Sequence, residues 1–283
     1  MPEALVRGVT INYEIVGASG PLIALTPGSR RAYGELIPLA RRLSESGHRV
    51  LLHDRRNCGA SDAAFDDSGS EHEVWADDLH ALCGQLGELP IVVGGSSAGA
   101  RLALLFALRH PNATRGLMLW RVTGGQAAVD RLAQNYYGQF IEIARKGGMQ
   151  AVCDSEHFSA LILARPSNRA RLMAIDPARF IKVMQAWREH FLRSASLPIV
   201  GATEAELLGL RVPACLIAGN DIIHTPVTAR KMASLVAGSE LHDDVVERRA
   251  DDNLKHDWDQ REWKQAEPRL VEIFTAFLRR AAV

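Results

Sequence analysis

The segment "IVVGGSSAGARLALLFALRHP", from Ile91 to Pro111, contains the pattern that decides the fold. It begins with a short apolar run, passes through small residues, and continues as an Ala/Leu-rich stretch from Ala98 to Arg109. A short apolar run bounded by glycines is typical of a buried strand, whereas the Ala/Leu-rich stretch has the length and composition of a helix. The segment therefore predicts a strand, a sharp turn and a helix in direct succession.

The turn matches the pattern G-x-S-x-G over residues 95–99, with Ser97 at its centre. A hydroxyl at this place lies at the carboxyl edge of a sheet, beside the free backbone N–H groups of a helix N-terminus. Ser96 is the alternative, but its frame needs Ala98 where glycine fits better. A glycine-rich turn that happens to contain serine is a second alternative. We predict that Ser97 is the nucleophile of a nucleophile elbow.

The same alternation of strand and helix patterns covers much of the chain. Short, largely apolar runs are followed by amphipathic stretches, which favours a parallel sheet with helices on both faces. Strands are expected in "INYEIVG", "LIALTPG", "RVLLHD", "PIVVGGS", "TRGLMLWRV" and "ACLIAGND", and near residues 240–246. Helices are expected over residues 35–46, 71–86, 98–109, 226–236 and about 268–280.

The alternation stops in the middle of the chain. Residues 123–210 carry helical patterns, such as "DPARFIKVMQAWREHFL", and no convincing strand. A helical block therefore interrupts the sheet domain late in its order of strands. We predict a core domain made of residues 1–122 and 211–283, and a helical cap domain made of residues 123–210.

The balance of charged residues argues against several classes of binding partner. The 283 residues include 33 Lys and Arg against 33 Asp and Glu, so no basic surface for nucleic acid or an anionic membrane is expected. The scattered cysteines predict free thiols, and the start of the chain does not resemble a signal peptide. No apolar run reaches the length of a membrane span. We expect a cytoplasmic protein with a small-molecule substrate; a homodimer is left open.

No nucleotide or metal motif is present in the sequence. The serine turn fits neither G-x-x-x-x-G-K-[ST] nor G-x-G-x-x-G, and the histidines and cysteines lack metal-ligand spacing. We therefore expect neither a cofactor nor a metal.

A second motif makes a family resemblance visible. The segment "HDRRNCGASD", residues 53–62, is similar to the D-x-R-G-x-G-x-S-D segment that follows a strand in the α/β-hydrolase superfamily. Haloperoxidase-like esterases and C–C bond hydrolases of aromatic degradation share it, although Asn57 stands here where glycine is usual. The resemblance spans nearly the whole chain and implies a mostly parallel, doubly wound, eight-stranded sheet with a helical cap insertion.

The resemblance also implies a triad in the order serine, acid, histidine. Asp221 ends the predicted strand "ACLIAGND" and precedes Pro226, which is similar to the family's acid loop; a turn-capping aspartate is the alternative. His256 lies before the last helix, where the family places its base, although Lys255 replaces the usual glycine. His224 is less favoured because it lies so close to Asp221, and His242 because it falls in a predicted strand.

The remaining candidate residues would stabilise an oxyanion or bind the substrate. Backbone N–H groups of Ala98 and Ser29 are the expected oxyanion donors, with an ordinary Pro-Gly turn as the alternative for Ser29. Arg30, Arg31 and Arg101 are candidates for a substrate carboxylate, with surface or ion-paired arginines as the alternative. Trp120 is expected to border the cap.

Together these features predict a serine hydrolase that cleaves an ester, lactone or related acyl bond through an acyl-enzyme. C–C bond hydrolysis of a vinylogous diketone acid is a close alternative on the same scaffold. A cofactor-independent oxygenase and a non-catalytic small-molecule binder remain as alternatives from other classes, because a fold does not fix a function.

Overall fold

A mixed sheet forms the centre of the molecule. The computed structural model describes residues 2–66, 68–247 and 261–281, and its eight strands lie in the order β1-β2-β4-β3-β5-β6-β7-β8. β1 pairs with β2, and β2 with β4, in antiparallel fashion; the other neighbouring strands are parallel. The strands are Glu3–Val6 (β1), Val9–Val16 (β2), Leu22–Thr26 (β3), Arg49–His53 (β4), Ile91–Ser96 (β5), Thr114–Trp120 (β6), Ala214–Ile217 (β7) and Glu240–His242 (β8). The predicted fold class is confirmed.

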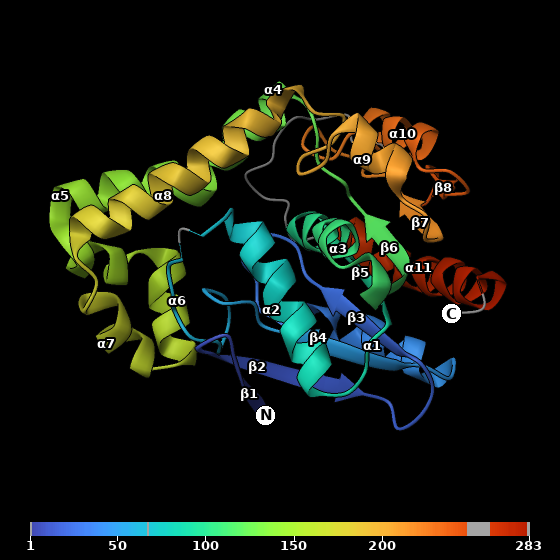
Figure 1. The fold of residues 1–283 in the computed structure, drawn as a ribbon, viewed down its shortest axis with the longest axis horizontal. Coiled ribbons are helices and arrows are strands. Elements are labelled where there is room, and N and C mark those ends of the chain that lie inside the picture. The colour runs from blue at the N-terminus through green and yellow to red at the C-terminus, as the bar shows by residue number, and fades with distance from the viewer. Residues whose placement is uncertain (1, 67, 248–260, 282–283) are drawn as a thin grey trace.

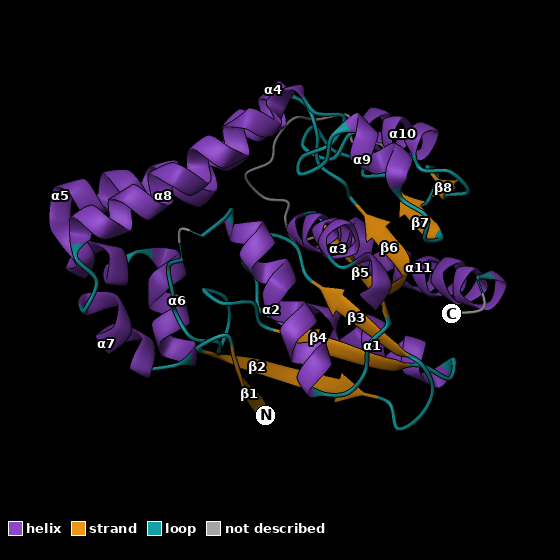
Figure 2. Cartoon of the chain, viewed as in Figure 1, coloured by secondary structure: helices purple, strands orange, loops and turns teal. Residues whose placement is uncertain are grey.

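The central strands are continuous apolar runs because helices cover both of their faces. Every residue of β3, β5 and β7 is buried. β1 lies at the edge and was not predicted, because it has only four residues and one of its apolar side chains, Leu5, is exposed. Figure 2 shows the strands of the sheet enclosed between helices.

The helices of the main domain divide between the two faces. α2 (Glu71–Gln85), α3 (Ala98–Arg109) and α10 (Pro226–Leu235) share one hydrophobic cluster, whereas α1 (Ile37–Glu45) and α11 (Arg261–Arg280) share another. Short 3-10 turns precede α1 at Tyr33–Leu36 and β6 at Pro111–Ala113. α11 begins before the predicted residue 268 because the helix accommodates Pro268 in its interior.

A helical block lies between β6 and β7, and we call residues 126–196 the helical insertion. It has a hydrophobic cluster of its own, which includes Phe158, Phe180 and Trp187. Its elements are α4 (Gln126–Ala133), a π-helical turn (Gln134–Gly138), α5 (Gln139–Asp154), α6 (Glu156–Ala164), α7 (Ser167–Met173), α8 (Pro177–Leu192) and a 3-10 turn (Arg193–Ser196). The long helix α8 runs from the α5 end to the α4 end of the block (Figure 1).

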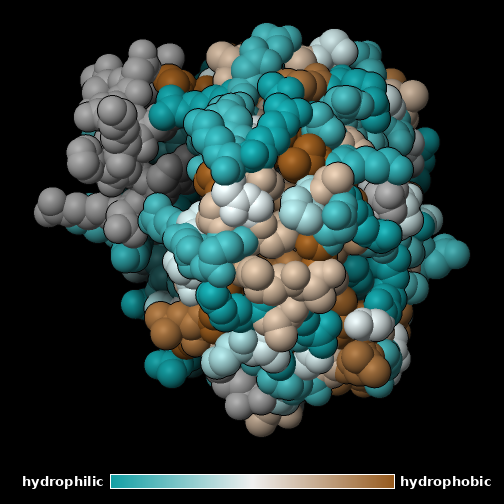
Figure 3. All heavy atoms as spheres, turned by 90° about the vertical axis from the view of Figure 1, so that its left-hand side faces the viewer, coloured by the Kyte–Doolittle hydropathy of each residue, from teal (hydrophilic) through white to brown (hydrophobic). Residues whose placement is uncertain are grey.

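The short helix α9 (Glu204–Gly209) follows the insertion but packs with the main domain, since Leu207 belongs to the cluster of α2 and α3. Seen from the side of α5, α6 and α7, the surface mixes hydrophobic and hydrophilic side chains (Figure 3). Within the part of the chain that is described, no helix combines the length and apolar character needed to cross a membrane.

Candidate active site

Ser97 occupies a strained turn between β5 and α3. Its φ of 53° and ψ of −110° are rare for a residue with a side chain. The backbone holds this conformation from both sides: the Ser97 N–H donates to Trp120 O at 3.1 Å, and the Ser97 carbonyl accepts from the Arg101 N–H at 3.0 Å. The hydrogen bond to β6 and the first turn of α3 thus fix the position of the hydroxyl.

The two glycines that flank Ser97 are required by close packing. A Cβ at Gly95 would lie 2.5 Å from the carbonyl oxygen of Thr26, and a Cβ at Gly99 would overlap the same oxygen. The turn therefore presses against the end of β3, and only glycine fits at either position. This contact explains physically why the sequence reads G-x-S-x-G.

A histidine lies in contact with the serine hydroxyl. His224 Nε2 is 2.8 Å from Ser97 Oγ, and His224 Nδ1 is 2.9 Å from each carboxylate oxygen of Asp221. Ser97 and His224 are buried, with 3% and 0% of their surfaces exposed. The three side chains form a continuous chain of contacts from hydroxyl to imidazole to carboxylate.

Asp221 and His224 come from one loop, between β7 and α10. Asp221 Oδ1 accepts hydrogen bonds from the backbone N–H groups of Ile223 and His224, both at 2.8 Å. This local turn folds the backbone around the carboxylate, so side chains three residues apart meet. The sequence analysis ranked His224 below His256 as the catalytic base because three residues looked too short a spacing from Asp221. The spacing D-x-x-H after a late strand was the available signal for this contact. The predicted base, His256, lies outside the described residues.

A buried arginine completes the surroundings of the acid. Arg121 follows β6 with a φ of 57°, and its Nη2 lies 3.0 Å from Asp221 Oδ2 and 3.5 Å from His224 Nδ1. Its guanidinium also stacks over Trp263, 5.5 Å from the ring centroid. Sequence patterns placed this arginine beside Trp120 at the border of the cap and gave it no catalytic role.

These contacts set the charges of the acid and the imidazole. Burial alone would raise the pKa of Asp221, but the hydrogen bond to His224 and the charge of Arg121 hold it well below its ordinary value. Burial, followed by the charge of Arg121, lowers the pKa of His224 to about 4, although Asp221 acts in the opposite direction. At neutral pH the site therefore contains a carboxylate and an uncharged imidazole that can accept a proton.

The loop with Ser29 adjoins the serine turn. A Cβ at Gly28 would lie 3.4 Å from the Cβ of Ser97, and Ser29 has a φ of 48°. The buried Arg55 holds this loop by donating to the carbonyl oxygens of Ser29, at 2.8 Å, and Arg31, at 3.2 Å. Ala98 is the first residue of α3, so its N–H belongs to the helix N-terminus beside Ser97.

The motif of residues 53–62 packs against the loop that contains Ser29 and holds it by hydrogen bonds. Asp54 accepts hydrogen bonds from the backbone N–H groups of Tyr33 and Ala60, at 2.8 and 2.9 Å. Asn57 has a φ of 64°, a conformation that glycine adopts readily and asparagine tolerates. Asparagine is therefore compatible with the left-handed backbone that this position of the motif adopts here.

The predicted substrate-binding residues differ in their surroundings. Arg30 pairs with Glu71 at 2.9 Å, and Arg31 pairs with Glu35 at 2.7 Å. Trp120 is buried in the layer that contains α11, with its ring 5.5 Å from that of Phe274. Arg101 contacts an imidazole instead of a carboxylate: its Nη1 lies 3.1 Å from His72 Nε2.

Several cavities surround the serine. The one that reaches Ser97 measures about 10 Å³ and is lined also by Arg101, Leu119 and Val200. A cavity of about 660 Å³ begins at Ser29 and is lined by residues of the helical insertion. Ser96, the alternative nucleophile, lines a different cavity of about 130 Å³.

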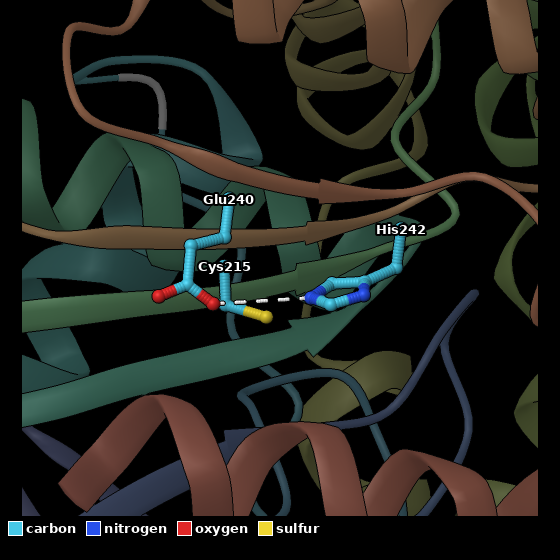
Figure 4. Close-up of side chains that lie close together, drawn as sticks. All are labelled: Cys215, Glu240 and His242. Atoms are coloured by element: carbon cyan, nitrogen blue, oxygen red, sulfur yellow. Dashed lines mark ion pairs between the residues drawn. The ribbon is translucent and has the colours of Figure 1, made fainter. Parts of the chain in front are cut away.

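A separate cluster lies at the far edge of the sheet. Cys215 of β7 and Glu240 and His242 of β8 place their potential ligand atoms within 4.8 Å of one another (Figure 4). Glu240 is also held by two hydrogen bonds from Arg280, and burial raises the pKa of Cys215 to about 12. A metal would have to displace the arginine and deprotonate this thiol, so we assign no ligand role to the cluster.

The chain belongs to the alpha/beta hydrolase fold family, whose model matches residues 27–178. It is 34% identical over 106 residues to the uncharacterized hydrolase YraK of Bacillus subtilis, and 35% identical over 108 residues to a proline iminopeptidase of Saccharolobus solfataricus. The matched parts span 38% and 34% of those relatives. A proline iminopeptidase of Lacticaseibacillus rhamnosus is 24% identical over 81% of this chain and 84% of its own.

Solved structures share the fold at low sequence identity. The enol-lactonase of Burkholderia xenovorans LB400 has a TM-score of 0.63 and 20% identity over 97% of this chain and all of its own. The meta-cleavage product hydrolase of Pseudomonas fluorescens IP01 has a TM-score of 0.61 and 19% identity over 98% of both chains. These likenesses support the fold of the whole chain, beyond the range of the family model.

Proposed function

We propose that the protein is a serine hydrolase that cleaves an ester, lactone or related acyl bond of a small molecule. The observation that carries the proposal is the contact chain from Ser97 through His224 to Asp221. A serine hydroxyl becomes an effective nucleophile only when a base can take its proton and a carboxylate orients that base. The helical insertion, residues 126–196, would act as the cap that shapes the substrate pocket.

In the first step His224 Nε2 takes the proton of Ser97 Oγ while that oxygen bonds to the carbonyl carbon of the substrate. The carbonyl electron pair moves onto its oxygen, which the N–H groups of Ala98 and Ser29 would stabilise. Asp221 keeps the Nδ1 proton of His224 in place and stabilises the imidazolium that forms. The acid itself stays ionised, which its strongly lowered pKa favours.

In the second step the oxyanion collapses and the bond to the leaving group breaks. The imidazolium of His224 donates its proton to the departing oxygen, which leaves an ester between the acyl group and Ser97. Water then attacks this ester while His224 again accepts a proton. The imidazolium returns that proton to Ser97 Oγ as the bond between this oxygen and the acyl carbon breaks, and the acid product departs. Ser97 and the neutral imidazole are restored, so the cycle needs no cofactor.

The described cavities leave little room for a substrate beside the nucleophile. The space at Ser97 holds only about 10 Å³, whereas the cavity beside Ser29 holds about 660 Å³. Tyr136 of the helical insertion stands at this boundary, with its hydroxyl 3.5 Å from Ser29 Oγ. Substrate entry would therefore require a shift of insertion side chains toward solvent.

Labelling and turnover measured together test the proposal. A fluorophosphonate should label the wild-type protein at one equivalent and leave Ser97→Ala unlabelled, while Ser96→Ala, the matched control, should still react. A panel of acyl esters, lactones and a vinylogous diketone acid should show turnover that Ser97→Ala loses by about 10³-fold or more.

The other outcomes separate the alternatives. Labelling without turnover of any panel member would favour a binder, and oxygen uptake with an aromatic substrate would favour an oxygenase. Turnover of the diketone acid alone would move the assignment to C–C bond hydrolysis.

A further inference from the structure

Arg101 is a buried cation without a carboxylate partner. Its side chain lies on α3, one turn after Ser97, and 5% of its surface is exposed. Among the residues described, Arg101 makes no ion pair; its Nη1 donates to His72 Nε2, and its Nε and Nη2 contact no hydrogen-bond acceptor. The charge of Glu71 acts on Arg101, but that carboxylate pairs with Arg30. Burying a guanidinium without an ion pair of its own is costly, so this arrangement requires an explanation.

The neighbouring imidazole cannot supply the missing charge. Burial, followed by the charges of Arg101 and Arg55, holds the pKa of His72 well below its ordinary value. The ring is therefore neutral, and since Nε2 accepts from Arg101, the proton lies on Nδ1. Phe191 covers the guanidinium, whose carbon is 4.5 Å from the ring centroid. His72 and Phe191 thus orient Arg101 without neutralising it.

The unused edge has a specific geometry. Nε and Nη2 are the two parallel donors of a guanidinium that match the two oxygens of a carboxylate. Elsewhere in this protein the same edge binds carboxylates in that way: Arg56 holds Asp78 at 2.6 and 2.7 Å, and Arg109 holds Asp77 at 2.9 and 2.8 Å. In Arg101 this edge is buried and has no hydrogen-bond acceptor among the described residues.

Arg101 also lies between the serine and a larger cavity. It lines the small cavity at Ser97 and a second cavity of about 320 Å³, which is bordered by His72, Trp187 and Phe191. Glu73 and Glu206 line the second cavity as well, but they accept hydrogen bonds from Ser70 and Thr203 at the starts of their own helices. A ligand anion is therefore the partner that this position can still take.

We propose that Arg101 forms a carboxylate-binding subsite, and that the substrates are small esters or lactones that also carry a carboxylate group. The assignment of the substrate class rests on the proposed hydrolase function. The binding of a carboxylate at Arg101 does not depend on turnover. The carboxylate would occupy the Nε and Nη2 edge while the acyl carbon lies at Ser97, one helical turn away.

Matched esters test the specificity. The wild-type protein should hydrolyse 4-nitrophenyl hydrogen adipate with a higher kcat/KM than 4-nitrophenyl hexanoate, which lacks the carboxylate. Arg101→Met should lower kcat/KM for the adipate ester by at least about 30-fold, the loss expected for a buried charged hydrogen bond, and change the hexanoate ester by less than about 3-fold. Arg109→Met removes an arginine of the same cavity whose edge is already occupied, and should leave the preference intact.

A binding measurement keeps the two proposals separate. Hexanoate, but not hexanamide, should raise the melting temperature of the Ser97→Ala protein, and Arg101→Met added to that variant should abolish the rise. Arg101→Met alone should melt no lower than wild type, because it removes a buried charge that has no ion pair among the described residues. Equal losses for both esters, or an unchanged response to hexanoate, would overturn the subsite; absence of all ester turnover would overturn only the hydrolase.

Discussion

His224 Nε2 lies 2.8 Å from Ser97 Oγ, although 127 positions separate the two residues in the chain. The contact exists because the loop after β7 returns to the carboxyl end of β5, where the serine turn is. The same loop carries Asp221, so one short segment provides both the acid and the imidazole of the site. The observed site therefore differs from the predicted one, in which the imidazole comes from His256 in a later loop.

Separate substitutions of His224 and His256 test which of the two histidines is the catalytic base. His224→Gln should lower kcat by about 10³-fold or more, since the Ser97 proton would lose its acceptor. His256→Gln should retain most of the activity. Steady-state hydrolysis of a 4-nitrophenyl ester measures both, and circular dichroism confirms that each variant is folded. The reverse ranking of the two variants would return the role of base to His256.

The pH profile of kcat/KM should report the lowered pKa of His224. Burial and Arg121 lower this pKa to about 4, so the imidazole is neutral and able to accept a proton at any pH above that value. Activity should therefore stay level from neutral pH down to about 5 and fall as the pH drops through about 4. An acid limb centred near the ordinary histidine value would contradict the buried environment.

The lowered pKa of His224 should also make the stability of the fold depend on pH between about 6.5 and 4. In the unfolded chain a histidine binds its proton below its ordinary pKa of about 6.5, whereas His224 in the folded chain does so only near 4. Between these values the unfolded state holds more protons, so the free energy of unfolding decreases as the pH falls. Circular dichroism at each pH separates loss of the fold from protonation of the base.

Packing at the serine turn predicts a large effect on stability. A Cβ at Gly99 would overlap the carbonyl oxygen of Thr26, which belongs to rigid backbone. Gly99→Ala should therefore lower the free energy of unfolding by roughly 3 kcal/mol or more, the upper range for overpacking. Gly34→Ala is the matched control, because nothing lies within 4 Å of its added carbon. Equal urea midpoints for the two variants would contradict this account.

The sequence was sufficient for the fold and for two of the three side chains of the contact chain, Ser97 and Asp221. Buried strands and the turn around Ser97 have strong local signals, because apolar runs and close glycine packing leave little choice of residue. Asp221 was also visible, at the end of an apolar run. The position of His224 depends on how Asp221 folds its own loop through two backbone hydrogen bonds. The spacing D-x-x-H is compatible with this contact but does not by itself give the fold of the loop.

Other features depend on contacts between distant segments. The importance of Arg121 follows from a pairing with Asp221 across 100 positions. Arg101 has no ion pair among the described residues because the nearby Glu71 pairs with Arg30 instead, which leaves Arg101 Nε and Nη2 without an acceptor. A sequence shows that an arginine is present but not whether its charge is matched. The open edge of Arg101 therefore became visible only when its neighbours were placed.

Arg121 should act on the reaction through the charge of its guanidinium. Its positive charge lowers the pKa of His224 and helps to keep Asp221 ionised, so Arg121→Met should move the acid limb of kcat/KM to higher pH by about one unit or more. Arg121→Lys keeps the charge and should leave the limb near its original position. Arg42→Met, which removes an exposed arginine paired with Glu267, should have no effect. A merely structural role of Arg121 would lower kcat at every pH without moving the limb, and that result would exclude the electrostatic role.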